Sequence, residues 1–410
     1  MVPGPKGRNG RHFCALPAPG RVASLARRRM IPIYADHNAT TLPDPEVRAV
    51  VDSAAARLWG NPSSVHRIGR EARAALDEAR YRLATLWACK PSEVVFTGGG
   101  TEANNLALLG TTRLLRSRGR HLLVSPVEHH AVLHTVQYLA RHEGFELTLL
   151  PVDALGRVDP ADVAARIRPD TVLVSVMAAN NEVGTVQPVA EIGRLCRERG
   201  VVFHTDAVQA FGKLPFRSMA DFEADLVTVC AHKFHGPKGA GALYVRSPLL
   251  PHPVQHGGAQ ENERRGGTEN LPAILGLVEA FARGVMPPVF PEGILRTRTE
   301  ALALSIAGLP GVTLRGHPTE RLPNTVAFTV QGTDSIALLA NLDLEGVCAS
   351  SGSACTAGSV EPSHVLQAMG VPPDESNALV RLSFGRDNTE EEFHRIAELL
   401  PKVIRRSRGQ

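Results

Sequence analysis

The sequence of 410 residues lacks several features that would place it in a specialised class of protein. No uninterrupted apolar run approaches the roughly 18–20 residues that a membrane-spanning helix needs. No internal repeat with a solenoid-like period is present. None of the six cysteines belongs to a CxxC pair, which disfavours a zinc ribbon and a disulfide framework, so no metal site is expected. Reduced thiols in a cytoplasmic protein are the expectation.

Acidic residues are absent from the first 35 positions, which hold seven Lys and Arg side chains. This basic leader, residues 1–29, has three open interpretations: a targeting segment, a disordered tail, or an extension upstream of a natural start at Met30. A secretory signal is disfavoured because no apolar core segment follows the early charges. The rest of the chain holds 38 basic and 41 acidic residues, so it gives no electrostatic footprint for nucleic acid.

Alternating helical and strand patterns from about residue 45 to 245 predict an α/β domain with a mainly parallel sheet flanked by helices. Short apolar runs predict buried strands at 121–127, 146–151, 171–177, 201–205, 225–230 and 240–245. The later part of the chain predicts a smaller α+β unit, with strands near 324–330, 346–350 and 379–384. We therefore expect a large domain at 45–262 and a small domain made of 30–44 and 263–410.

Three consecutive glycines, Gly98 to Gly100, follow an apolar strand and precede a helix that begins at Thr101. Glycines let the backbone approach an anion closely, and the free N–H groups of a helix N-terminus attract phosphate. The segment therefore suggests a phosphate loop. A plain loop with Thr101 as helix cap is the alternative.

Two further segments place polar side chains directly after buried strands. Asp206 ends an apolar strand, at the edge of the sheet where α/β proteins bind ligands, and Gln209 follows one turn later. Lys233 comes after the strand at 225–230, in a glycine-rich bend that can present its amine to a cleft. Alone, Asp206 is equally well a helix cap, and a lysine is most often a solvated charge. The order of phosphate loop, aspartate and lysine favours a pyridoxal-phosphate (PLP) site.

A fourth motif, Ser-Ser-Gly-Ser-Ala-Cys-Thr at 350–356, surrounds Cys355 with small, flexible residues. A free cysteine is usually a buried small hydrophobe. Here almost nothing apolar stands beside it to pack against, so an exposed, reactive nucleophile is the better interpretation.

Together these segments resemble the cysteine desulfurases of the PLP fold type I superfamily, the class V aminotransferase-like enzymes. They are most similar to the NifS/IscS-like group with the Ser-Ser-Gly-Ser-Ala-Cys-Thr loop. The resemblance runs from about Tyr34 to the final helix. Further matching segments are 34–41, 60–66, 127–129, 180–184, 264–268 and 379–386. It implies removal of sulfur from L-cysteine, giving L-alanine and a persulfide on the enzyme.

The resemblance also implies roles for individual residues around the cofactor ring. Lys233 would bind PLP covalently and take the Cα proton of the substrate. Asp206 would pair with the pyridine nitrogen, and Gln209 with the phenolic oxygen. His129 would stack on the ring and shuttle protons. Asn181 would contact both cofactor and substrate.

At the phosphate end, the resemblance assigns Gly100, Thr101 and His232 to the cofactor. Thr268 would reach the phosphate in the neighbouring subunit, which implies a homodimer with shared sites. One departure concerns Cys230, where the family usually has a hydroxyl residue that contacts the phosphate. A thiol is a weak donor, so we expect weaker retention of PLP.

At the substrate end, the resemblance assigns the substrate carboxylate to Asn181 and Arg386, and the sulfur to Cys355. The thiolate of Cys355 would attack the substrate sulfur and then pass it to an acceptor, such as an iron–sulfur scaffold or an enzyme of tRNA or cofactor thiolation. No direct binding of nucleic acid or membrane is expected. A selenocysteine lyase or related C–S lyase remains the alternative, and an aminotransferase or a scaffold without catalysis is less well supported.

Overall fold

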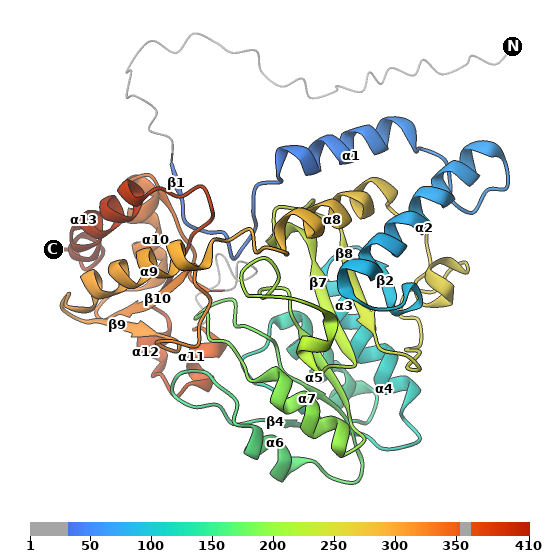
Figure 1. The fold of residues 1–410 in the computed structure, drawn as a ribbon. Helices are drawn as coiled ribbons and strands as arrows, with labels where there is room; N and C mark the ends of the chain where they lie inside the picture. Colours follow the sequence, from blue (N-terminus) through green and yellow to red (C-terminus); the bar gives the residue numbers. More distant parts are fainter. Residues whose placement is uncertain (1–31, 353–361) are drawn as a thin grey trace, which may run out of the picture. The chain divides into compact units, whose positions relative to one another are not determined.

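Seven strands of mostly buried side chains form the central sheet of the computed structural model, which describes residues 32–352 and 362–410 (Figure 1). Their order is β2-β8-β7-β6-β5-β3-β4, and β8 alone runs antiparallel to its neighbours. The strands are β2 (Val94–Thr97), β3 (His121–Val124), β4 (Glu146–Leu149), β5 (Thr171–Ser175), β6 (Val202–Asp206), β7 (Leu226–Cys230) and β8 (Gly241–Val245). The predicted mainly parallel sheet is confirmed.

Helices cover both faces of this sheet, because successive strand side chains point to opposite sides. In β2, Val94 and Phe96 join one hydrophobic cluster, whereas Val95 joins another on the opposite face. The first cluster includes side chains from α1 (Pro45–Arg57), α2 (Arg67–Trp87), α6 (Pro160–Arg166), α7 (Val189–Glu198) and α8 (Leu271–Gly284). On the other face lie α3 (Gly100–Asn105), the π-helical η2 (Leu106–Gly110), α4 (Thr111–Leu114) and α5 (His130–His142).

A separate core forms around a three-stranded antiparallel sheet in the C-terminal part. Its order is β12-β10-β9, with β9 (Val312–Arg315), β10 (Thr325–Val330) and β12 (Leu379–Ser383). The helices are α9 (Glu292–Ala307), α10 (Ser335–Leu344), α11 (His364–Ala368), α12 (Pro373–Ser376) and α13 (Glu390–Ser407). The early strand β1 (Ile33–Tyr34) pairs with β11 (Val347–Cys348) and adds Ile33 to this core.

The two cores support our proposal of a large and a small domain within the compact unit 32–410. Because α8 packs on α1 and α2 and belongs to the larger core, we place the proposed boundary between Val285 and Phe290 instead of at 262.

Several helix and strand limits differ from the sequence-based ranges. The helix expected to begin at Thr101 begins at Gly100 and is interrupted by the π-helical stretch η2, and the short β9 and α12 were not predicted. Strand β3 ends at Val124, so the following residues form a connection that leads to His129. Within residues 32–352 and 362–410, none of the helices combines the length and apolar character that a bilayer crossing requires. The basic leader 1–29 and Cys355 lie outside the described residues.

Candidate active site

The carboxyl ends of several parallel strands meet around a cavity of about 230 Å³. It is lined by nine residues predicted from the sequence: Gly100, Thr101, His129, Asn181, Asp206, Gln209, Cys230, His232 and Lys233. Asn38, Ala39, Asn104, Met177, Val208 and Arg381 complete the lining. This is the position at which open α/β sheets bind ligands.

The glycine loop after β2 lets helix α3 begin close to the ends of β6 and β7. Gly99 has a φ of 151°, which favours glycine. A Cβ on Gly100 would lie 3.0 Å from Val208 Cγ2 and 3.4 Å from Cys230 Cβ, so a larger residue would crowd the cavity. The cavity wall therefore depends on the absence of a side chain here.

Asp206 is the last residue of β6 and is 4% exposed. Its Oδ1 accepts from the N–H of Val208 at 3.0 Å, and its Oδ2 accepts from Asn104 Nδ2 at 2.7 Å. Both neighbours donate hydrogen bonds to the carboxylate, which fixes its orientation. Asn104 belongs to α3, so the glycine loop and the aspartate are directly connected.

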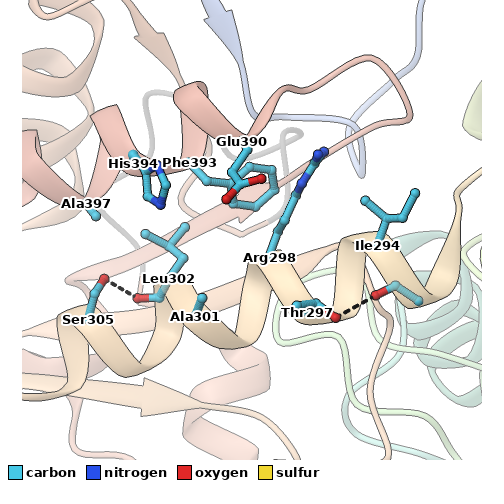
Figure 2. Close-up of a pocket in the computed structure, with 11 residues that line it drawn as sticks. Ile294, Thr297, Arg298, Ala301, Leu302, Ser305, Glu390, Phe393, His394 and Ala397 are labelled. Atoms are coloured by element: carbon cyan, nitrogen blue, oxygen red, sulfur yellow. Dashed lines mark hydrogen bonds between the residues drawn. The ribbon is translucent and has the colours of Figure 1, made fainter.

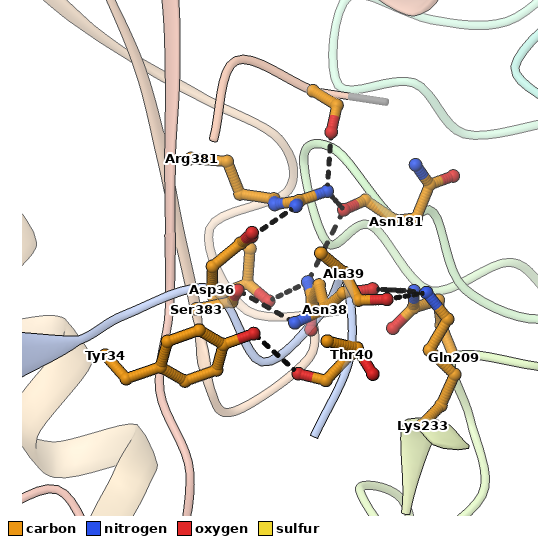
Figure 3. Close-up of polar contacts among 12 residues, drawn as sticks. Tyr34, Asp36, Asn38, Ala39, Thr40, Asn181, Gln209, Lys233, Arg381 and Ser383 are labelled. Atoms are coloured by element: carbon orange, nitrogen blue, oxygen red, sulfur yellow. Dashed lines mark hydrogen bonds and ion pairs between the residues drawn. The ribbon is translucent and has the colours of Figure 1, made fainter. Parts of the chain in front are cut away.

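Lys233 lies in the one-turn helix η4 (Ala231–Lys233) that follows β7. Its Nζ donates to the carbonyl oxygens of Asn38 and Ala39, at 2.7 Å each (Figure 3). Burial lowers the pKa of Lys233 to about 8, and nearby Arg381 adds to the effect. A lysine of this kind is a substantial fraction neutral near pH 8, and the neutral amine is the nucleophilic form.

Gln209 is held between a carbonyl and a second lysine. Its Nε2 donates to the Asn38 carbonyl at 2.9 Å, and its Oε1 accepts from Lys213 Nζ. Asn38 was inside a matching sequence motif, but no pattern had pointed to Lys213.

Two histidines of the cavity are neutral. His129 caps α5, and its Nδ1 accepts from the N–H of Ala131 at 3.0 Å, which places the ring proton on Nε2. Burial lowers the pKa of His129. Burial and the charge of Lys233 lower the pKa of His232 to about 4, and its Nδ1 lies 3.1 Å from Thr40 Oγ1.

Cys230 ends β7 with its side chain 4% exposed. Its Sγ makes a weak contact of 3.9 Å with the carbonyl of Ala240. Burial raises the pKa of the Cys230 thiol, so it stays protonated at neutral pH and is a poor nucleophile.

The two arginines of the segment 379–386 have different surroundings. Arg381, on β12, lines the cavity: its Nη2 lies 2.7 Å from Asp36 Oδ1, and its Nη1 donates to the carbonyls of Asn181 and Gly352 (Figure 3). Arg386, predicted from the sequence, is not among the lining residues. It pairs with Asp44 at 2.7 Å and borders a different cavity. The strand pattern of the sequence could have distinguished the two arginines, because only Arg381 lies within β12.

One other predicted residue, Thr268, does not line the cavity, and Cys355 is not among the described residues. Thr268 is exposed and borders a separate hollow with Thr97, Gly98 and Arg265. Cys355 belongs to the segment 353–361, outside the described residues. Gly352, which directly precedes that segment, has its carbonyl on Arg381 Nη1 at 2.7 Å.

A larger hollow of about 710 Å³ lies between α9 and α13 (Figure 2). Its lining includes the apolar residues Ile294, Leu302 and Phe393, and its polar members include Arg298, Glu390 and His394. Arg298 already donates to the Asn388 carbonyl at 2.9 Å. This hollow brings together no lysine, aspartate and phosphate loop, so the smaller cavity is the better candidate.

The lining of the smaller cavity fits PLP on chemical grounds. A partly neutral lysine can bond an aldehyde, a buried aspartate can pair with a protonated ring nitrogen, and the glycine loop offers backbone N–H groups to a phosphate. One buried donor of the lining, Arg381 Nε, also lacks a partner within the described residues.

Comparison with known proteins shows the family to which the chain belongs. The sequence matches the aminotransferase class-V family over residues 33–396, so the chain belongs to that family. It is 42% identical over 377 residues to a cysteine desulfurase IscS of Methanosarcina thermophila, covering 92% of this chain and 93% of that protein. It is 44% identical to a putative cysteine desulfurase IscS 1 of Bacillus subtilis, covering 91% and 99%.

Solved structures show the same likeness. A NifS-like protein superposes with a TM-score of 0.84 at 34% identity, covering 91% of this chain and 99% of that one. The structure of SspA in complex with cysteine superposes with a TM-score of 0.76 at 33% identity, covering 87% and 100%. Within the aminotransferase class-V family, the chain therefore belongs to the NifS/IscS-like cysteine desulfurases, which are PLP-dependent enzymes.

Proposed function

We propose that this chain removes sulfur from L-cysteine with PLP bound on Lys233, yielding L-alanine and a persulfide on Cys355. The observation that most supports this is the meeting of Lys233, Asp206 and His129 in one cavity. When bound, PLP would withdraw electrons from the substrate Cα, helped by Asp206 on its ring nitrogen. Gly100, Thr101, His232 and Cys230 would hold its phosphate, and Gln209 would donate to its phenolic oxygen.

Arg381 suits the substrate carboxylate better than Arg386. It is 1% exposed, lines the cavity, and has a buried Nε–H without a partner in the described part of the chain. The planar guanidinium can form a two-point contact with a carboxylate. We therefore assign the carboxylate to Arg381 and Asn181, and consider Arg386 a structural partner of Asp44.

Proton transfer is assigned to Lys233 and His129. The lowered pKa of Lys233 suits a base that takes a proton from Cα and returns it near neutral pH. The proton on His129 Nε2 would be available to the reacting atoms, because Nδ1 is already occupied by the Ala131 N–H.

Sulfur transfer is assigned to Cys355. Its thiolate would attack the substrate sulfur, so that an S–S bond forms while the Cβ–S bond breaks. The electron pair of the broken bond passes to Cβ, which is then protonated, and alanine leaves. Gly352, the last described residue before the segment that contains Cys355, accepts from Arg381 Nη1 through its carbonyl.

We also propose a homodimer in which Thr268 contacts the phosphate in the neighbouring site. Thr268 is exposed and does not line its own cavity, which agrees with a role in a second subunit. Exposed apolar side chains at Leu42, Trp59 and Val65 offer surface for such contact. We propose further that the protein acts in the cytoplasm and passes its sulfur to an iron–sulfur scaffold or a thiolation enzyme.

The test is an assay of the purified protein with L-cysteine and a thiol reductant, following alanine and sulfide together. We expect equal release of both, and loss of both in Lys233→Ala. If the wild-type protein binds PLP but releases neither product, the assigned substrate is wrong. If Cys355→Ala loses activity on cysteine and keeps activity on selenocysteine, a lyase function is favoured.

A further inference from the structure

A second lysine, Lys213, lies buried behind the cavity wall. It follows Gln209 by four residues in the turns after β6, and its side chain is fully buried. Its Nζ donates to Gln209 Oε1 and lies 5.4 Å from the ring centroid of Phe290. Within the described residues, it forms no ion pair with a carboxylate.

Such a position is costly, because lysines are almost never fully buried without a charged partner. Burial lowers the pKa of Lys213 well below its ordinary value of 10.5, and Lys233 and Arg381 add to this effect. In either protonation state, Lys213 retains N–H groups that can donate hydrogen bonds. If the side chain only filled space at this position, methionine or leucine would give a more stable protein.

The neighbours of Gln209 allow one orientation of its amide. On one side is the Asn38 carbonyl, which can only accept, at 2.9 Å from Nε2. On the other side, Lys213 donates to Oε1. If the amide were turned over, its oxygen would face the Asn38 carbonyl, and that contact would be repulsive.

This orientation matters for the cavity, because Gln209 lines it. One of the two Nε2 protons is used by the Asn38 carbonyl, so the second remains for a ligand. The same carbonyl also accepts from Lys233 Nζ at 2.7 Å. Lys213, Gln209, Asn38 and Lys233 thus form one chain of hydrogen bonds, most of which can be followed in Figure 3.

We propose that Lys213 is a positioning residue: it holds the amide of Gln209 so that Nε2 donates to the phenolic oxygen of PLP. This inference rests on the proposed PLP-binding roles of Lys233 and Gln209. A donated hydrogen bond stabilises negative charge on the phenolic oxygen and makes the lysine-bound cofactor less basic. Without it, the cofactor would hold its proton to higher pH.

The test uses the PLP-loaded enzyme and the visible absorption of its lysine-bound cofactor, titrated with pH. In Lys213→Met, we expect the apparent pKa of this absorption change to rise by roughly one unit, as for loss of one hydrogen bond to a charged group. Lys213→Gln, which keeps a donor without the charge, should restore most of the wild-type value. Thermal unfolding of each variant serves as the control for folding.

A double-mutant cycle separates positioning from a direct effect of charge. Gln209→Ala should raise the apparent pKa by a similar amount, and adding Lys213→Met should raise it no further. A full additional shift in the double mutant would overturn the proposal, as would an unchanged value in Lys213→Met alone.

If Lys213→Met does not fold, a neutron or atomic-resolution structure of the wild-type enzyme with PLP decides the question. Gln209 Oε1 facing Lys213 supports the proposal, and Nε2 facing Lys213 overturns it. The failure of the proposed function has a different signature. In that case the wild-type protein shows no lysine-bound absorption, or the absorption survives in Lys233→Ala.

Discussion

Arg381 and Asp36 form an ion pair at 2.7 Å beside the cavity, with the arginine side chain only 1% exposed. Five residues further on, Arg386 pairs with Asp44 and is partly exposed. This contrast offers a matched pair of variants. We expect Arg381→Lys to raise KM for L-cysteine by roughly tenfold or more, because a lysine cannot form the two-point contact with a carboxylate. Arg386→Lys should leave KM within about twofold.

Steady-state kinetics on both variants checks this assignment, with bound PLP measured to confirm an intact site. The opposite pattern, a raised KM in Arg386→Lys alone, would show that Arg386 binds the substrate carboxylate.

The lowered pKa of Lys233 predicts the pH dependence of cofactor loading. Only the neutral amine attacks the aldehyde of PLP, and burial lowers the pKa of Lys233 to about 8. The rate at which the apoenzyme gains lysine-bound absorption should therefore rise with pH, with a midpoint near pH 8 and a plateau at higher pH. Stopped-flow absorbance after addition of PLP measures this rate. A midpoint near the ordinary lysine value of 10.5 would contradict the prediction.

Glu128 predicts a pH-dependent stability difference. It is fully buried, its Oε1 accepts from the Met177 N–H at 2.5 Å, and Oε2 has no partner in the described residues. Burial, together with Asp206, raises the pKa of Glu128 well above its ordinary value of 4.5. The folded state then holds a proton that the unfolded state releases, so wild-type stability falls as pH rises above 4.5 toward the raised pKa.

Glu128→Gln removes this titration while keeping a similar shape. The variant should gain stability relative to wild type as pH rises, by up to about 1.4 kcal/mol per pH unit. Denaturant unfolding at pH 5 and pH 8 gives the comparison. A difference between the two proteins that does not change with pH would show that Glu128 is ionised in the folded state.

Cys230 predicts an improvement in cofactor binding. Its thiol is buried beside Gly100 and makes only a weak contact with the Ala240 carbonyl. A serine hydroxyl is a stronger donor to phosphate, so Cys230→Ser should lower the PLP dissociation constant by roughly three- to tenfold. Fluorescence titration of the apoenzymes measures this constant. Equal dissociation constants in the two proteins would show that the thiol of Cys230 does not weaken PLP binding.

Sequence patterns predicted the class of fold and most of the cavity, because strand alternation and strand-end motifs are local. Asp206 ends a buried strand and Lys233 follows one, and parallel strands bring such ends together. Contacts between distant segments were not predictable in the same way. Asn38 reaches Lys233 from nearly 200 positions away, and Lys213 looked like any solvated lysine. The choice of Arg381 over Arg386 depended on which arginine is fixed inside β12 by pairing with β10.

The most direct test of the proposed reaction is mass spectrometry of the protein after a single turnover of L-cysteine without reductant. We predict one extra sulfur atom on the peptide that contains Cys355, and one alanine released for each PLP bound. Cys355→Ala should keep its PLP and gain no sulfur. Alanine released without sulfur on Cys355, or sulfur found on another cysteine such as Cys348, would contradict the proposed role of Cys355.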